Sequence, residues 1–186
     1  MESIGFKEWS LVCDAIGRGE QCVLLRKGGI AEGRGGFCFQ HREFFLFPTF
    51  FHEQITNVRN APGTLPQATD LSTITLYVQI EQAVHITSLV MAEALAPLHV
   101  LAPRLVAERF AYKGEGLSVA FVRAFQLSQP WSFPNEKRFG GCRSWISLPA
   151  PPPLYIQPVL DDHAHRQRRA QFHRIVSSAK TAALQS

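Results

Sequence analysis

The segment Cys22-Val23-Leu24-Leu25-Arg26-Lys27-Gly28-Gly29 contains the most informative fold signal in this chain. Its apolar residues predict a short strand over residues 21–26, and the glycine pair predicts a turn directly after it. A second apolar run, Phe44 to Phe47, ends at Pro48-Thr49, with His52 close behind. Two strands that end in basic and hydrogen-bonding side chains predict an anion or nucleotide site at one rim of a sheet, but they do not name a reaction.

Length and charge set the broad class of protein. A chain of 186 residues, of which 46% are hydrophobic, is long enough to bury one substantial core. The formal charge of +4 favours anionic partners such as nucleic acid, although many basic proteins bind none.

The spacing of the cysteines predicts a reducing compartment. They are Cys13, Cys22, Cys38 and Cys142. No C-x-x-C pair occurs, so buried free thiols are favoured over a zinc site assembled from distant residues, and no metal or cofactor is expected.

The N-terminus lacks the basic and apolar regions of a signal peptide, and no apolar run is long enough to cross a bilayer. We therefore expect a cytoplasmic protein without a membrane segment.

Apolar spacing predicts the remaining elements. Helices are expected over residues 5–16, 88–98 and 103–110, strands over 37–39, 44–47, 73–86, 117–127 and 144–148, and a long surface loop over 56–70. Pro130 and Pro134 are expected to begin a loop after the strand 117–127.

The last part of the chain is expected to be a connector followed by a helix. The proline-rich run 149–153 predicts a stiff segment, and residues 161–184 combine many arginines with an apolar stripe for docking or self-association. This divides the chain into a domain of residues 1–148, a connector of 149–158 and a basic C-terminal helix of 159–186.

Arg26 and Lys27 are the first candidate site residues. Consecutive strand residues point to opposite faces, so both can reach one ligand only if the turn at Gly28 and Gly29 rotates the backbone. Exposed amides beside a guanidinium would suit a phosphate or a carboxylate. The alternative is a strand end with two solvated cations.

Three further clusters are candidates. His41, Glu43, Thr49, His52 and Glu53 could supply acid–base groups or part of a metal site, or could line an ordinary exposed strand. The run Gly140-Gly141-Cys142-Arg143-Ser144-Trp145 could bring Arg143 and Trp145 to a ligand, with Trp145 otherwise a core residue. The run Phe44-Phe45-Leu46-Phe47 is expected in the core, and Phe50 or Phe51 could stack on a base.

Nuclease chemistry of the restriction type is disfavoured. Those enzymes need an acidic residue two positions before a lysine to hold magnesium. Here the strand reads Leu25-Arg26-Lys27, so a leucine stands where the acid is required.

Several of these motifs, in this order, resemble the bacterial family called domain of unknown function 1802. They are Trp9 with Ala15, Gly19-x-Gln21-x-x-Leu24-Leu25-Arg26-Lys27-Gly28-Gly29-Ile30, Phe47-Pro48-Thr49 with His52, Arg123-Ala124-Phe125-Gln126-Leu127, and Gly141-Cys142-Arg143-Ser144-Trp145. The family pattern continues after His99 with an aromatic residue and a threonine, where this chain has Val100 and Leu101. Members joined to endonuclease domains imply a restriction–modification or defence context and a partner nuclease.

Gly19 and Arg26 are also similar to the Gly-x-Lys-x-x-Glu-x-Arg signature of ASCH domains, which belong to the PUA-like group. The lysine and the glutamate of that signature are Gln21 and Leu24 here, so the hydrolase chemistry of the group is not implied. The resemblance implies an α+β fold with a mostly antiparallel, partly closed PUA-like β-barrel, flanking helices and the basic C-terminal helix.

The function predicted from these residues and resemblances is nucleic-acid binding, with a modified or flipped base as a possible target. The ligand-binding residues would be Arg26, Lys27, Gly28, Gly29, Thr49, His52, Arg143 and Trp145. The alternatives are an enzyme that acts on a nucleoside with His/Glu acid–base groups, and a non-catalytic scaffold for the partner nuclease.

Overall fold

The computed structural model describes residues 1–27, 37–65, 69–114 and 116–182, with side chains described as far as residue 178. Gly28 and Gly29, two of the predicted ligand-binding residues, lie outside the described residues. The strands are β1 Ile4–Trp9, β2 Val23–Arg26, β3 Glu43–Thr49, β4 Leu71–Ile86, β5 Leu117–Pro134, β6 Trp145–Ser147 and β7 Ile156–Pro158. The helices are α1 Ser10–Gly17, α2 Gln54–Asn57, α3 Leu89–Ala94, α4 Pro103–Ala111 and α5 Asp162–Ala182, with 3-10 turns at Ala96–Leu98 and Lys137–Phe139.

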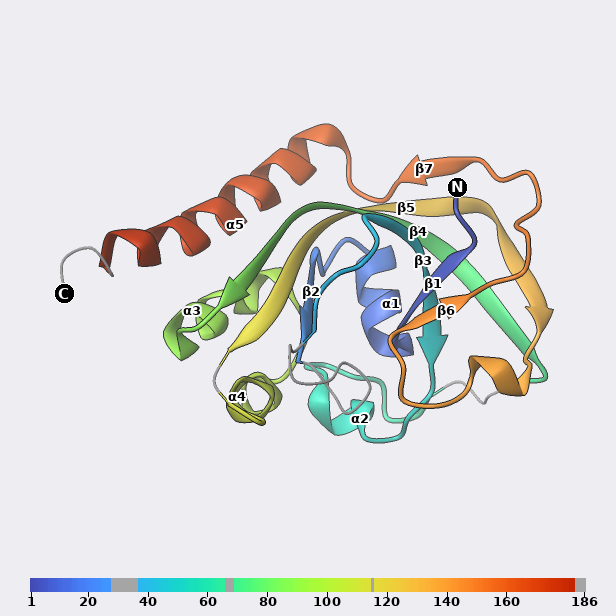
Figure 1. Ribbon diagram of the computed structural model, residues 1–186. Coiled ribbons are helices and arrows are strands. Elements are labelled where there is room, and N and C mark those ends of the chain that lie inside the picture. Colours follow the sequence, from blue (N-terminus) through green and yellow to red (C-terminus); the bar gives the residue numbers. More distant parts are fainter. Residues whose placement is uncertain (28–36, 66–68, 115, 183–186) are drawn as a thin grey trace.

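These strands form one sheet in the order β2-β5-β4-β3-β1-β6, with β7 on β5. Only the β1–β3 pairing is parallel among those of the described residues, so the predicted α+β, mostly antiparallel sheet is confirmed. The long strands β4 and β5 arch over α1 (Figure 1). The barrel is not closed, however, because β2 and β6 are the two edges of the sheet and do not pair in the described chain.

Alternation along β3 gives the sheet a core on each face. Phe44 and Leu46 belong to the main core with α1, whereas Phe45 and Phe47 belong to a second core beneath β6 and the outer ends of β4 and β5. The prediction that the apolar run 44–47 lies in the core is therefore confirmed, since none of its residues is more than 6% exposed.

The predicted helix over residues 5–16 is wrong in its first half. Residues 4–9 form β1, which lies between β3 and β6, and the helix begins only at Ser10. Phe6 and Trp9 have helical spacing, but pairing with two distant strands overrides that local pattern. A glycine fits position 5 of β1 because any larger residue would bring its Cβ within 2.9 Å of the Ile146 side chain.

Other boundaries differ where prolines or loops were expected to end an element. Strand β5 runs through Pro130 to Pro134, and Pro130 has no partner in the β4 register, so the ladder bypasses the missing N–H. The predicted strand over 37–39 is absent, although Phe37 is buried. Within the predicted loop over 56–70, Val58 is buried and forms a bridge with Leu101.

Helix α5 packs on the sheet rather than only following it. Its Phe172 is fully buried and lies 5.3 Å, centroid to centroid, from Phe121 of β5. A register shift between Ile80 and Gln82 occurs at Glu81, whose carboxylate contacts His165 of α5 at 2.9 Å. Figure 1 shows the far end of α5 extending beyond the body of the protein.

Candidate ligand-binding site

Arg26 ends β2 and reaches across the open side of the sheet to β1. Its guanidinium donates to the carbonyl oxygen of Lys7 and lies 3.2 Å from the Glu8 carboxylate. The guanidinium carbon is also 4.5 Å from the centroid of the Phe6 ring, which suits a cation–π contact. Side-chain contacts thus join β1 and β2 where backbone pairing does not.

A pocket of ≈210 Å³ opens beside this ion pair. It brings together three of the predicted ligand-binding residues, Arg26, Thr49 and Arg143, from β2, β3 and the segment before β6. Lys7, which the sequence did not single out, lies in the same wall. The described lining residues are Lys7, Glu8, Trp9, Arg26, Thr49, Phe51, Gly141, Cys142, Arg143 and Ser144.

Lys7 is held at the rim by the 140–144 segment. Its ammonium donates to the carbonyl oxygen of Gly141 at 2.9 Å. Partial burial lowers the pKa of Lys7, and the positive charge of Arg143 lowers it further, while Cys142 acts in the opposite direction. Lys7 and Arg143 therefore form a pair of neighbouring cations, each of which would gain from an anion placed between them.

Glu8 is the only acidic residue among the described residues that line this pocket, and its charge is already engaged. One carboxylate oxygen accepts the Trp9 backbone N–H at 2.8 Å, and the other contacts Arg26. With one carboxylate against Lys7, Arg26 and Arg143, the described lining of the pocket has a net positive charge. We call it the cationic pocket.

A second guanidinium lies behind the first. Arg109 of α4 stands over the Trp9 ring at 4.9 Å and donates to the carbonyl oxygen of Leu25 at 3.3 Å. Burial, and then the charge of Arg26, lower the pKa of Arg109 to about 10, although Glu8 offsets part of this effect. Two guanidinium groups therefore lie near the one Glu8 carboxylate, so positive charge exceeds negative charge in this region.

The other predicted site residues lie elsewhere. The Lys27 ammonium turns away from Arg26 and donates to the carbonyl oxygens of Phe110 at 3.2 Å, Gly116 at 2.7 Å, and Gly114. His52 is exposed in the turn before α2. Trp145 packs on Phe6 at 4.7 Å between ring centroids, and its indole N–H is buried without a partner.

The sequence offered His52 with Glu43 or Glu53 as an acid–base couple, and the structure separates His52 from Glu43. Glu43 begins β3, whereas His52 follows its end, so the length of a seven-residue strand separates them. Glu43 instead accepts hydrogen bonds from the Tyr77 hydroxyl at 2.7 Å and the Gln79 amide at 3.2 Å. Over the described residues, no group of three or more His, Cys, Asp and Glu side chains is placed to hold a metal ion.

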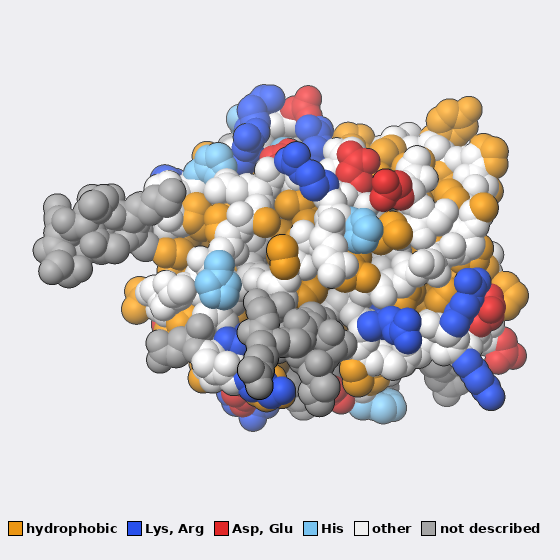
Figure 2. Space-filling model, viewed as in Figure 1, with side chains coloured by type: hydrophobic (Ala, Val, Ile, Leu, Met, Phe, Trp, Pro, Cys, Tyr) orange, Lys and Arg blue, Asp and Glu red, His pale blue; other side chains and the backbone are white. Residues whose placement is uncertain are grey.

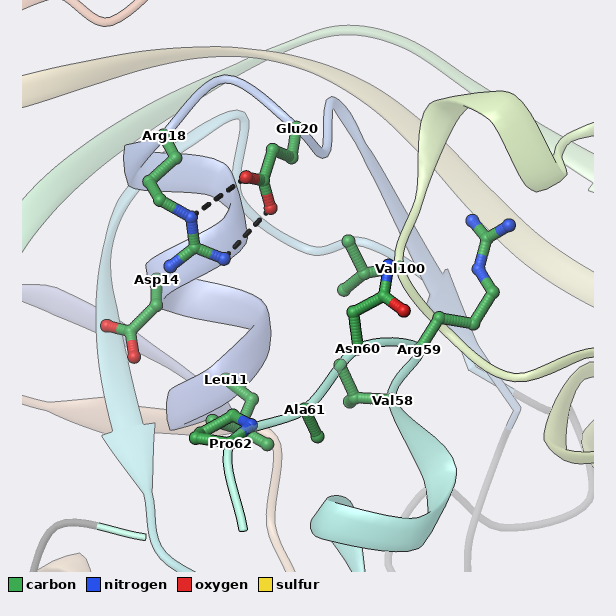
Figure 3. A pocket seen from close by; sticks show the side chains of 10 residues that line it. All are labelled: Leu11, Asp14, Arg18, Glu20, Val58, Arg59, Asn60, Ala61, Pro62 and Val100. Carbon is green, nitrogen blue, oxygen red and sulfur yellow. Dashed lines mark hydrogen bonds and ion pairs between the residues drawn. The ribbon is translucent and has the colours of Figure 1, made fainter. Parts of the chain in front are cut away.

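A larger pocket of ≈680 Å³ lies between α1 and the segment that follows α2 (Figure 3). Its charged side chains largely satisfy one another or the backbone. Arg18 and Glu20 form two hydrogen bonds, at 3.0 and 2.9 Å, and Arg59 donates to the carbonyl oxygens of Ala96 and His99. The floor is apolar, with Leu11, Val58 and Val100. This balance of charge distinguishes it from the cationic pocket.

Comparison with known proteins identifies the family. Residues 5–171 match the model described as Domain of unknown function (DUF1802), so this chain belongs to that family. The resemblance to this family that was seen in the sequence is thereby confirmed. No curated protein matches significantly.

Similar solved structures include the ASCH protein from Zymomonas mobilis. It is 12% identical, with a TM-score of 0.48, and the match covers 78% of this chain and 87% of that one. A point mutant of the same protein gives a TM-score of 0.42 at 12% identity, over 69% and 72% of the two chains.

None of the helices in the described part of the chain has the length and apolar character required to span a membrane.

Proposed function

We propose that this protein is a nucleic-acid-binding module whose cationic pocket holds a backbone phosphate. The observation that carries the proposal is the convergence of Lys7, Arg26 and Arg143 on one pocket, in which the one carboxylate of the described lining is already paired. Lysine and arginine side chains supply most of the affinity of proteins for phosphate backbones.

The residues would have different roles. Lys7 lies at the rim and Arg143 is exposed, so both can contact phosphate directly. Arg26 is held by its ion pair with Glu8, so it would attract the phosphate through its positive charge from within the pocket wall. Phe51 also lines this pocket and is 53% exposed, so it offers a ring on which a base can stack.

The finer parts of the proposal extend to the ligand and the biological setting. A modified or flipped base is the kind of target we propose, on an open PUA-like barrel, without catalysis by this chain. A restriction–modification or defence context, with a partner nuclease, follows from the family resemblance and is proposed on that ground alone. Figure 2 shows a second group of basic side chains over α5, a surface that could contact such a partner.

Fluorescence anisotropy with labelled DNA and RNA oligonucleotides tests the proposal. The wild-type protein should bind at low salt and lose affinity steeply between about 50 and 200 mM salt. Lys7→Ala and Arg143→Ala should each weaken binding and reduce the salt slope by about 1, because each removes about one phosphate contact.

Arg18→Ala is the matched control, since it removes an exposed cation from the other pocket. It should leave the salt slope unchanged. Wild-type protein that binds no nucleic acid at low salt would refute the proposal.

A further inference from the structure

The segment of residues 47–51 separates the cationic pocket from another pocket of ≈180 Å³. Thr49 and Phe51 line the cationic pocket, whereas Phe47, Pro48 and Phe50 line its neighbour. Because one stretch of backbone contributes to both walls, a ligand that crosses this segment could enter both.

The two pockets differ in charge. None of the described residues that line the second pocket is ionisable at neutral pH, so we call it the neutral pocket. Its lining combines aromatic and aliphatic surface with hydroxyl and amide groups: Phe47, Pro48, Phe50, Thr69, Leu71, Ser72, Thr73 and Asn135. A nucleobase has the same character, since it is flat, uncharged and edged with hydrogen-bonding groups.

The polar groups of the neutral pocket are arranged by contacts between β4 and the end of β5. The Ser72 hydroxyl donates to the Asn135 side-chain oxygen at 3.2 Å, and the Thr73 and Ser132 hydroxyls lie 2.8 Å apart. The first contact leaves the NH2 group as the donor end of the Asn135 amide. A base edge entering here would meet an amide donor and hydroxyl groups.

Two consecutive phenylalanines are exposed on the dividing segment. Phe50 is 39% exposed and Phe51 is 53% exposed, while the three phenylalanines and the leucine of 44–47 are buried. Exposed phenylalanine rings at the mouths of two pockets carry an energetic cost in water, which a stacked base would relieve.

We infer that the neutral pocket is a subsite for an unpaired base, and that the ligand is therefore a single strand which crosses residues 47–51. The inference rests on the proposed function, because the adjoining phosphate would sit in the cationic pocket. Bases in a duplex are stacked on each other and cannot present a face to Phe50, whereas an unstacked base can.

A strand carrying the fluorescent base 2-aminopurine tests this subsite, because stacking on an aromatic ring quenches its emission. Wild-type protein should quench the probe in single-stranded DNA or RNA and should bind those strands more tightly than the matching duplex. Phe50→Ala should abolish the quenching and weaken single-strand binding by about 5- to 150-fold, the range measured for loss of a base–aromatic stack.

Two further variants make the test specific. Phe50→Leu keeps apolar bulk without an aromatic face and should also lose quenching. Tyr155→Ala removes another exposed aromatic side chain, 80% exposed and outside both pockets, and should change neither readout. Melting temperatures verify that each variant is folded.

The outcomes separate this inference from the proposed function. Equal affinity for single strand and duplex, with Phe50→Ala no weaker than Tyr155→Ala, overturns the base subsite. If Lys7→Ala still reduces the salt slope in that case, the phosphate pocket stands without the subsite. Absence of any binding by wild-type protein overturns both.

Discussion

Glu8 is a buried carboxylate whose two oxygens are both engaged. Its side chain is 4% exposed and contacts Arg26, which is 16% exposed. A buried carboxylate is tolerated because the ion pair and the Trp9 amide satisfy it. Removing one partner leaves the other as an unpaired charge away from water, so the residue stabilises the fold as well as the pocket.

Glu8→Ala should therefore lower the free energy of unfolding by about 3–5 kcal/mol, the usual cost of breaking a buried pair from one side. Guanidinium denaturation measures the change. The double variant Glu8→Gln with Arg26→Met removes both charges and should recover a large part of the loss. If Glu8→Ala is as stable as wild-type protein, the buried pair does not stabilise the fold.

His99 links stability to pH. It is 2% exposed, its Nδ1 accepts the Leu101 N–H at 3.1 Å, and its Nε2 has no partner. Burial, followed by the charges of Arg59 and Arg109, lowers its pKa from 6.5 to about 4. The folded protein thus keeps His99 neutral where the unfolded chain would protonate it.

Because the unfolded state binds the extra proton, stability should fall as pH decreases from 6.5 towards 4, by up to about 3 kcal/mol from this group. Denaturation at pH 7 and at pH 4.5 measures this loss. His99→Asn keeps an acceptor for Leu101 but cannot titrate, so it should lose less stability over the same interval. An equal loss in both proteins would exclude His99 as the source.

At the scale of elements, distant contacts determine the local structure of β1 and the position of α5. β1 becomes a strand because β3 and β6 pair with both its edges. Helix α5 was correctly predicted from its own pattern, but its place on β5 depends on Phe172 and His165, which contact Phe121 and Glu81.

Phe172→Ala should lower the free energy of unfolding by about 3–5 kcal/mol, because it leaves a cavity against Phe121. Hydrogen exchange of the α5 amides should rise at the same time. Arg174→Ala, at an exposed position of the same helix, is the control and should change little. A stable Phe172→Ala variant would show that α5 does not need this anchor.

At the scale of the whole molecule, the sheet is open where the candidate site lies. β1 and the sheet edge β2 are not paired in the described sheet, and Arg26 of β2 reaches Lys7 and Glu8 of β1 through its side chain. The cationic pocket occupies this junction, and the neutral pocket adjoins it across residues 47–51. The fold thus brings three basic side chains from separate parts of the chain to one place.

Local pattern was sufficient for the strands at 23–26, 43–49 and 71–86, for α4 and α5, and for the buried phenylalanines of β3, since their periodicity records which face is apolar. Arg26, Thr49 and Arg143, which line the cationic pocket, were singled out from sequence because each adjoins the end of an apolar run or a glycine pair. Only the tertiary structure revealed Lys7, separated it from the carbonyl-bound Lys27, and made residues 4–9 a strand. Those outcomes depend on pairing between distant segments, which leaves no periodic trace in the sequence of either partner.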